Sequence, residues 1–539
     1  MKKLLLVFVF SVLFCSCKAT DVYIQEAYVE KSYLVKEITL FTEEIKLEAS
    51  DDAENDQFIN AIWVSQFDMH PIYRDCNTQR DEDDYRQRIE LLTDNLVRDG
   101  FDTVFLQVRP NGDSMFESEF YPNSKYIAGV YGESIKYDAV RIFLDVATDK
   151  GLSVHAWINP FRLCGETELV NYGKGTLFNW YNEGIGKRIE RGTDGLLYLD
   201  PSYEEATELI VDGVKEILTK YDFDGIHLDD YFYPTEFEFN DEREFLLSGY
   251  SGVGDFRRSN IDRTVKALYD AVHTFNDKVF GIAPAGNIYS LSNGWYVDIY
   301  KWLESDGFVD YIMPQLYYGF LNSTCPFERV LNDWSSAVKN NNIKLYIGLS
   351  AAKCELGSKG VEDAYAGNYG KFEWRDNKDI LKRSFESIVN INADGVCIFT
   401  YSSFYDPLSG NGNEFTEEER SAFCEAIKNR AGQPLDFYLL LFGIGFSDKL
   451  FGINYKTLVY TFADNSAFIV CDNLKDKPSA FPFDKLGSCA DLHSYGCCGD
   501  MLDVKKCSNC SFGFVKNTFE RFACRLFDQC KHRRGCVYL

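Results

Sequence analysis

The stretch Asp224-Gly225-Ile226-His227-Leu228-Asp229-Asp230-Tyr231 combines a short apolar strand with carboxylates at its carboxyl end. Alternate residues of a strand face opposite sides, so His227, Asp229 and Tyr231 share one face. A pair of aspartates after a strand is also a common loop cap. The functional interpretation therefore depends on whether other strands repeat the pattern, because barrel enzymes keep their chemistry at the carboxyl ends of their strands.

The pattern recurs along the chain. Strand-like runs fall near residues 61–66, 103–109, 153–159, 224–229, 279–283, 309–315, 343–349 and 394–401. The segments between them are long enough for a helix, and several have apolar residues at helical spacing, such as Tyr85, Ile89, Leu92 and Leu96. A strand followed by a helix eight times predicts an α/β fold, a parallel (β/α)8 TIM barrel, over residues 59–430.

Each predicted strand has one apolar face and one face that ends in a polar or aromatic group. In a closed barrel these ends would meet around one mouth, lined by Trp63, Asp68, Gln107, Arg109, Asn159, Asp229, Gln315, Tyr317 and Tyr401. Amides, phenols and charged groups can bond to sugar hydroxyls, and aromatic faces can stack on sugar rings. A structural hydrogen bond explains any single member equally well, so the prediction of a hydroxyl-rich substrate rests on the set.

Composition excludes some partners. The chain has 539 residues, of which 45% are hydrophobic, and can bury one barrel-sized core with a smaller region beside it. Its formal net charge of −27 would repel a phosphate backbone, which argues against nucleic acid as a partner. No glycine-rich phosphate loop, His-Glu-x-x-His metal motif or nucleophile elbow is present in the sequence, and we expect no cofactor.

The first 17 residues have the character of an export signal. Lys2 and Lys3 precede an apolar run from Leu4 to Phe14, which is too short for a permanent membrane span. The segment Phe14-Cys15-Ser16-Cys17 is similar to a bacterial lipobox, with Cys17 as the lipid-attachment residue. We therefore expect an exported protein held at the membrane by its amino-terminal lipid alone, with plain secretion as the alternative. Residues 18–58 are acidic and weakly patterned, as in a linker.

The region 431–539 differs from the rest of the chain. It contains nine of the 17 cysteines, eight of them between Cys489 and Cys536, including the pair Cys507-Ser508-Asn509-Cys510. Such a cluster could bind zinc. In an exported protein disulfides are the favoured use of these cysteines. The sequence assigns no role to this region.

From residue 59 to about 408 the chain resembles a bacterial family, glycosyl-hydrolase-like family ten, whose envelope proteins include enzymes that cleave peptide-stripped peptidoglycan glycans. The resemblance rests on 61–64, 107–114, 155–162, 199–201, 224–234, 313–317 and 399–401, read as AIWV, QVRPNGDS, HAWINPFR, LDP, DGIHLDDYFYP, MPQLY and FTY. Asn111 and Phe161 depart mildly from the pattern. The resemblance implies a glycan substrate and extends the predicted binding set by Trp157, Arg162, His227 and Tyr231.

Glycoside hydrolysis generally uses two carboxyl groups, one as a proton donor and one as a nucleophile or base. Asp229 is the primary catalytic candidate because it faces the predicted mouth, with His227 one layer below it. Asp230 should alternate outward unless the strand bends. Asp113 is the preferred partner because it lies in a matched segment, while Glu117 and Asp406 stay open as alternatives. The sequence therefore predicts a glycoside hydrolase acting on peptidoglycan glycan or a related envelope polysaccharide, or else a non-catalytic glycan-binding barrel.

Overall fold

The computed structural model describes residues 58–76, 78–192, 194–229, 232–234 and 241–431, and the backbone of three later strands. The chain divides into two compact units, Asn55–Gln433 and a second unit made of Met1–Glu54 with Pro434–Leu539. In the second unit β14 (Tyr455–Thr461), β15 (Ala467–Asn473) and β16 (Asp476–Pro482) form an antiparallel sheet. The predicted signal, Cys17, the linker before residue 58 and the cysteines from Cys489 onward lie outside the described residues.

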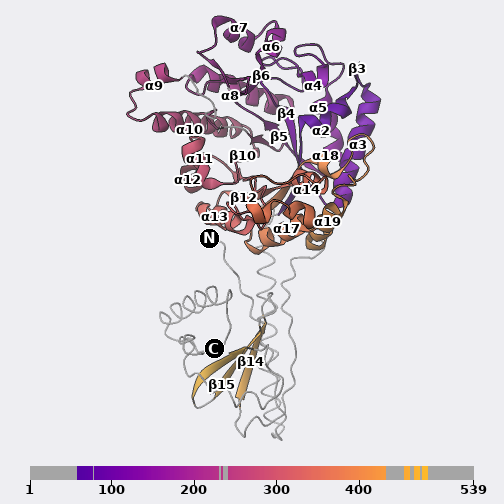
Figure 1. The fold of residues 1–539 in the computed structure, drawn as a ribbon, viewed down its shortest axis with the longest axis vertical. Coiled ribbons are helices and arrows are strands. Elements are labelled where there is room, and N and C mark those ends of the chain that lie inside the picture. Colours follow the sequence, from indigo (N-terminus) through magenta and orange to yellow (C-terminus); the bar gives the residue numbers. More distant parts are fainter. Residues whose placement is uncertain are drawn as a thin grey trace. The chain divides into compact units, whose positions relative to one another are not determined.

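The first unit is built on a closed parallel barrel (Figure 1). Around the barrel the strand order is β1-β13-β12-β11-β10-β9-β5-β4, and every pairing is parallel. The strands are β1 (Ile59–Val64), β4 (Thr103–Arg109), β5 (Ser153–Ile158), β9 (Gly225–Leu228), β10 (Val279–Ile282), β11 (Tyr311–Ile312), β12 (Lys344–Ser350) and β13 (Gly395–Phe399). This confirms the predicted (β/α)8 barrel, and each strand lies within or close to a predicted run.

Helices surround the barrel because each strand presents an apolar face outward. The outer helices are α3 (Glu82–Asp99), α5 (Ala139–Asp149), α8 (Glu204–Lys220), α10 (Val253–Val272), α13 (Phe327–Ala337), α17 (Ile380–Asn390) and α19 (Glu417–Ala431). In α3 the predicted stripe Tyr85, Ile89, Leu92 and Leu96 is buried. Sequence also sets the bounds of α3, because the Asp81 carboxylate accepts from Asp84 N–H at its start and Gly100, at φ 91°, ends it.

Shorter elements fill the connections. They are α2 (Gln66–Tyr73), β2 (Arg74–Asp75), β3 (Thr78–Gln79), α4 (Lys125–Ala128), α9 (Glu242–Ser248), α11 (Ile288–Gly294), α12 (Ile299–Glu304), α14 (Ala351–Ser358), α15 (Gly367–Gly370), α16 (Glu373–Asp376) and α18 (Tyr401–Phe404). None of the helices in the described part of the chain is long and apolar enough to cross a membrane.

The connection between β5 and α8 contains a substructure that the sequence did not predict. A three-stranded antiparallel sheet forms there in the order β6-β8-β7. Its elements are β6 (Arg162–Gly165), α6 (Glu166–Leu169), η2 (Val170–Tyr172), α7 (Thr176–Glu183), β7 (Ile189–Arg191) and β8 (Leu196–Leu199). Figure 1 shows α6 and α7 at the edge of the unit, beyond the ends of β4 and β5.

The barrel interior is filled by a separate, largely aromatic cluster. It consists of Ala61, Trp63, Phe105, Trp157, Ala283, Tyr311, Met313 and Cys397. Glycines on neighbouring strands make room for the large rings: a Cβ at Gly281 would lie 2.1 Å from the Tyr311 ring, and one at Gly348 would lie 2.7 Å from Trp63. The interior is therefore a packed core, and a substrate can enter only above it.

Closure of the barrel joins distant parts of the chain. Ile59 of β1 is in register with Gly395 of β13. Next to this seam the Arg430 guanidinium carbon lies 3.9 Å from the centre of the Phe58 ring. The first and last parts of the barrel unit are thus in direct contact.

Candidate active site at the barrel mouth

Asp229 directly follows β9 at the carboxyl end of the barrel. Its backbone N–H donates to the Ile158 carbonyl at 3.2 Å, which continues the pairing with β5 by one residue. The Gln315 side-chain N–H donates to Asp229 Oδ1 at 3.0 Å and to the Ala283 carbonyl at 3.2 Å. Gln315 therefore fixes the orientation of the carboxyl group, as expected if both residues face the same mouth.

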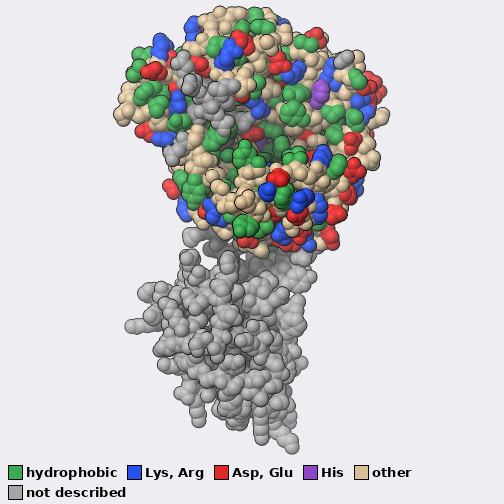
Figure 2. Space-filling model, in the orientation of Figure 1, with side chains coloured by type: hydrophobic (Ala, Val, Ile, Leu, Met, Phe, Trp, Pro, Cys, Tyr) green, Lys and Arg blue, Asp and Glu red, His purple; other side chains and the backbone are tan. Residues whose placement is uncertain are grey.

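Tyr317 lies close to Asp229 as well. Burial and, next, the charge of Asp229 raise the pKa of the Tyr317 phenol well above its usual value, so the phenol stays protonated. Its ring stacks on Phe399 with 5.8 Å between centroids. The structure thus brings Asp229, Gln315 and Tyr317 together at the carboxyl end of the barrel. Figure 2 shows a hollow near the centre of the face in view, with hydrophobic side chains beside it.

Below the mouth, a hydrogen-bonded chain crosses the barrel. Trp63 Nε1–H donates to His227 Nε2 at 3.1 Å, and His227 Nδ1 lies 3.1 Å from the Tyr311 hydroxyl. That hydroxyl lies 3.4 Å from His155 Nδ1. Because the indole can only donate, His227 carries its proton on Nδ1 and donates to Tyr311, whose hydroxyl proton is left for His155. Trp63 and His227, predicted to bind substrate, therefore form the floor beneath Asp229.

The two histidines of this hydrogen-bonded series, His155 and His227, are neutral. Burial lowers the pKa of His155 to about 4, with Asp224 opposing the shift and Lys278 adding to it. Burial, and then His155, lower the pKa of His227 well below its usual value. A protonated imidazole has two donors and no acceptor, so protonation of either ring would remove an acceptor from this series of hydrogen bonds. The arrangement therefore requires uncharged histidines.

This burial predicts a loss of stability in acid. The unfolded histidine binds a proton below about pH 6.5, whereas folded His155 resists protonation until about pH 4. The stabilisation is complete above the unfolded pKa and is lost as pH falls through this window. We expect His155→Asn, which keeps an acceptor near Nδ1, to remove about 2 kcal/mol of the change in unfolding free energy between pH 7 and 5. Urea unfolding at both pH values measures the difference, and identical pH slopes for both proteins would contradict it.

Amide side chains tie the neighbouring loops to the mouth. Gln107 Oε1 accepts from the Gln66 backbone N–H at 2.9 Å, and Gln107 Nε2 donates to Asn159 Oδ1 at 2.6 Å. Both amides are buried. The two residues lie together, as predicted, and Gln107 holds the start of α2 in place.

Asp68 joins the first and last strands of the barrel. Its Oδ2 accepts from Ser65 N–H at 2.7 Å, from Ser65 Oγ–H at 2.8 Å and from the Thr400 hydroxyl. Its Oδ1 accepts from Ser402 N–H at 2.9 Å. The Asp68 side chain is fully buried, so it positions the loops after β1 and β13 and presents no surface to a ligand.

Two residues predicted to face the mouth point elsewhere. The Arg109 guanidinium is buried, donates to Tyr121 Oη at 2.6 Å and Pro160 O at 2.6 Å, and lies over the Tyr121 ring. The register of β4 against β5 shifts between Gln107 and Arg109, which ends the simple alternation. Tyr401 falls in α18, beyond the end of β13, and its hydroxyl accepts from Asn95 of α3 at 3.2 Å.

The candidates for a second carboxylate bond to residues other than those that hold Asp229. Asp113 is fully buried, its Oδ1 accepts from Asn111 N–H at 2.8 Å, and burial raises its pKa. The role of Asp113 as the second carboxylate stays a prediction. Glu117 accepts from Asn123 at 2.8 Å, and Asp406 accepts from Ser409 N–H at 2.7 Å within its own loop. Asp230 and Tyr231 lie outside the described residues, and their assignments stay predictions.

Two further members of the predicted set differ in exposure. Trp157 is buried in the interior cluster, and its indole N–H has no hydrogen-bond partner among the residues that the structure describes. Arg162, at the start of β6, is partly exposed and donates to the Pro110 carbonyl at 3.3 Å. Within the described residues, no group of three or more His, Cys, Asp or Glu side chains could hold a metal ion.

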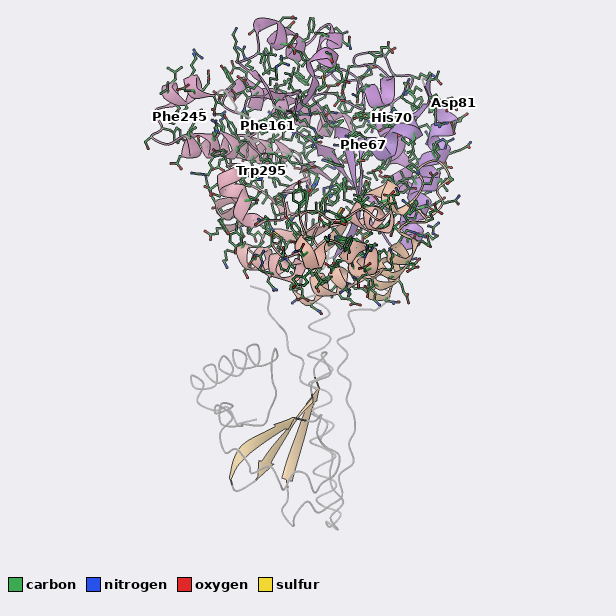
Figure 3. All side chains as sticks on the ribbon, in the orientation of Figure 1. Phe67, His70, Asp81, Phe161, Phe245 and Trp295 are labelled. Atoms are coloured by element: carbon green, nitrogen blue, oxygen red, sulfur yellow. The ribbon has the colours of Figure 1, made fainter. Side chains whose placement is uncertain are left out.

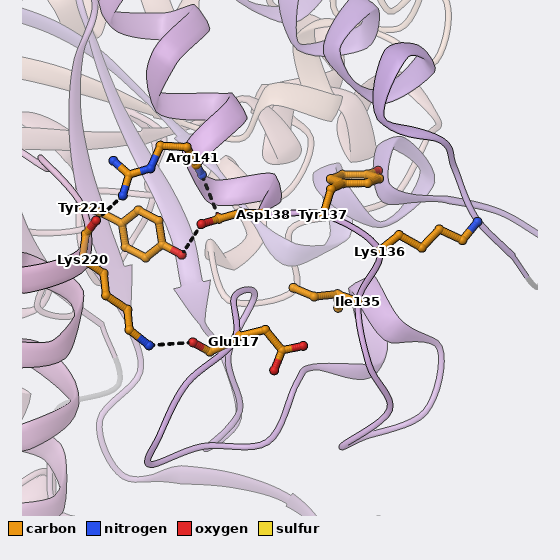
Figure 4. A pocket seen from close by; sticks show the side chains of 8 residues that line it. All are labelled: Glu117, Ile135, Lys136, Tyr137, Asp138, Arg141, Lys220 and Tyr221. Carbon is orange, nitrogen blue, oxygen red and sulfur yellow. Dashed lines mark hydrogen bonds between the residues drawn. The ribbon is translucent and has the colours of Figure 1, made fainter.

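A second hollow, of about 420 Å³, lies between the start of α5 and the end of α8 (Figure 4). Three of its polar side chains donate to other lining residues. Tyr221 donates to Asp138 at 2.9 Å, Lys220 donates to the Glu117 carbonyl at 2.8 Å, and Arg141 donates to the Lys220 carbonyl. These contacts join the start of α5 to the end of α8.

The sequence did not single out the aromatic residues beside the mouth. Phe67 follows the first strand and is 66% exposed. Figure 3 labels Phe67 and His70 close to each other and Trp295 apart from them, toward the lower left. The available signal was a phenylalanine at the second position of the helix that follows β1, next to Asp68, which the sequence had placed near the mouth.

The sequence model of the family described as "Glycosyl hydrolase-like 10" matches residues 58–366. "Glycosyl hydrolase YngK" of Bacillus subtilis (strain 168) is 28% identical over 328 residues, or 56% of this chain and 62% of that protein. "Glycosyl hydrolase DigH" of Escherichia coli (strain K12) is 28% identical over 361 residues, or 61% of this chain and 80% of that protein. The chain thus spans less than two thirds of YngK.

Among solved structures, the chain is similar to the PgaB (BpsB) glycoside hydrolase domain from Bordetella bronchiseptica. The identity is 13% and the TM-score 0.45, with 69% of this chain and 99% of that chain covered. It is also similar to a β-amylase catalytic domain from Paenibacillus polymyxa, at 12% identity and a TM-score of 0.44, covering 70% and 99% of the two chains. Because the family model matches more than half of the 539 residues, this protein belongs to the Glycosyl hydrolase-like 10 family.

Proposed function

We propose that this protein is a glycoside hydrolase that cleaves the glycan strands of peptidoglycan or a related envelope polysaccharide. The observation that carries the proposal is the Asp229 carboxyl at the end of β9, held by Gln315 at 3.0 Å beside the Tyr317 phenol. Family membership and the relatives named as glycosyl hydrolases support the reaction class. The resemblance of the matched motifs to envelope proteins supports the choice of glycan.

In this proposal Asp229 acts on the bond that is cleaved, as proton donor or as nucleophile and base. Gln315 keeps the carboxyl in one orientation, so that no reorganisation is needed when the sugar binds. The neutral Trp63–His227–Tyr311 floor excludes water from below. Asp113, which is fully buried, and Asp230 stay the predicted candidates for the second carboxylate.

Turnover of purified glycan strands tests this function directly. We expect release of shorter saccharides from strands freed of peptides, and less from strands that still carry them. The alternative function is glycan binding without cleavage on the same barrel. Cosedimentation with the strands, without any release of reducing ends over a long incubation, would favour that alternative and contradict hydrolysis.

We further propose that the protein is exported and attached to the membrane through lipid on Cys17, within the segment Phe14-Cys15-Ser16-Cys17. The Cys17→Ser variant should lose incorporation of radiolabelled palmitate and move from the membrane to the soluble fraction. Retention of label in this variant would rule out Cys17 as the attachment point. Export without any label in the wild-type protein would favour plain secretion.

A further inference from the structure

An aromatic surface flanks one side of the mouth. Phe67 of α2 contacts Tyr126 of α4 edge to face, with 5.7 Å between ring centroids, and His70 contacts the same tyrosine at 5.7 Å. Phe67 is 66% exposed and His70 is exposed as well. We call Phe67, His70 and Tyr126 the α2 platform. Its exposed apolar area costs free energy in water, which a stacked sugar ring would recover.

The α2 platform is held rigidly against the site. The residue before Phe67 donates its backbone N–H to Gln107 at 2.9 Å, and the residue after it is Asp68, fixed at the barrel seam. His70 Nδ1 is 3.1 Å from the Tyr126 carbonyl, and Arg74 donates to the Ile127 carbonyl at 3.0 Å. The backbone that carries the platform residues is therefore fixed before a ligand binds, which lowers the entropy lost on binding.

A second aromatic pair lies on the Asp229 side. Trp295 and Phe232 are both partly exposed, and their ring centroids are 4.0 Å apart. The Trp295 carbonyl accepts from Tyr233 N–H at 3.2 Å, which ties the loop after β10 to the loop that begins with Asp229. The indole of Trp295 is thus placed by the same loop that carries the candidate catalytic group.

The strand order puts these two surfaces on opposite sides of the mouth. In the closed order β1-β13-β12-β11-β10-β9-β5-β4, the fourth strand from β1 in either direction is β10. Phe67 lies in the segment after β1 and Trp295 in the segment after β10, so the two residues belong to opposite sides of the ring of strands, and Figure 3 labels them apart. Asp229 follows β9, the neighbour of β10, so it lies on the Trp295 side of the mouth, across the ring of strands from the α2 platform.

We propose that the α2 platform and Trp295 are two sugar-stacking subsites for one extended linear glycan, which crosses the mouth with sugar units on both sides of Asp229. The inference rests on the proposed function, since it deepens the assignment of a glycan substrate to the same mouth. A chain bound on both sides of the carboxyl is cut at internal bonds. The protein thus selects long strands over short saccharides, and its first products are themselves oligosaccharides.

The test measures binding separately from cleavage. Phe67→Ala and Trp295→Ala are made in the Asp229→Asn background, and cosedimentation with peptide-free peptidoglycan strands gives their affinities. We expect each change to weaken binding about tenfold, as loss of one stacked ring should, while the affinity for a disaccharide fragment stays unchanged. Phe67→Trp should bind like the parent. Tyr300→Ala, which removes an exposed ring from the outer helix α12, is the matched control.

Product analysis supplies the second readout. With Asp229 intact, we expect wild-type protein to release mixed oligosaccharides early, and Phe67→Ala to raise KM for strands with little change in kcat. Equal strand affinity in Phe67→Ala, Trp295→Ala and the parent would overturn the inference, as would strands that do not bind at all. Platform-dependent binding without any cleavage would leave the subsites standing and overturn the proposed hydrolysis. If Phe67→Ala and Trp295→Ala both leave cleavage unchanged, the two subsites are ruled out and the proposed hydrolysis stands.

Discussion

Asp229→Asn should lower the rate of glycan cleavage by at least about a thousandfold, because an amide can neither transfer the proton nor attack the sugar. The substitution is nearly isosteric, and the amide oxygen can still accept from Gln315 Nε2, now 3.0 Å from Asp229 Oδ1. The fold should therefore be retained. Release of reducing ends from peptide-free strands, with thermal melting in parallel, measures the two effects separately.

Asp222→Asn is the control for this change. Asp222 precedes the same strand at the opposite end of the barrel, and its side chain is 91% exposed with Lys278 as its partner. We expect the activity of this variant to match that of the wild type. Near wild-type turnover in Asp229→Asn would rule out a catalytic role for Asp229. A larger loss in Asp230→Asn than in Asp229→Asn would show that the strand bends one residue earlier, because a shift of one residue exchanges the two faces.

Asp68→Ala should destabilise the barrel by about 3–5 kcal/mol, since its carboxylate satisfies buried donors on both sides of the barrel seam. Without it the N–H groups of Ser65 and Ser402 lose partners at 2.7 and 2.9 Å, and the Thr400 hydroxyl must find another acceptor. Urea unfolding measures the free energy directly. Loss of the seam should also loosen α2 and with it the Phe67 ring.

Asp83→Ala serves as the comparison, because Asp83 is an exposed acid in the first turn of α3. Its removal should change the unfolding free energy by less than about 0.5 kcal/mol. If Asp68→Ala were as stable as Asp83→Ala, the loops after β1 and β13 would have to be held by packing alone.

Local pattern was sufficient to predict the barrel. In β9 and β5, alternation along the strand correctly placed His227 and Trp157 on the inner side, because a period of two follows directly from strand geometry. The β6-β8-β7 sheet was missed because its strands are three or four residues long, too short for a periodic signal. Length between strands indicated only that a helix would fit there.

The candidate site was predicted only in part, because strand alternation holds only as far as each strand continues. Arg109 and Tyr401 were placed by extending the alternation, which a register shift ends in β4 and a helix ends after β13. The sequence also does not show how deep an inward-facing residue lies along the barrel axis. Trp63 is buried in the floor, whereas Gln315 reaches solvent. Phe67 went unnoticed because exposure of a single aromatic side chain depends on tertiary packing, which sequence period does not encode.

The contact between Phe58 and Arg430 allows the barrel unit to be circularly permuted. Since the two ends of the barrel unit touch, a short peptide could join them, and the chain could then be opened at an exposed loop elsewhere. Such a circular permutant would keep every strand pairing of the barrel, including Ile59 with Gly395. In the natural order this pairing must wait until the last strand has left the ribosome, whereas a permuted chain could form it early. The same barrel could therefore be reached by folding routes that differ only in which seam closes last.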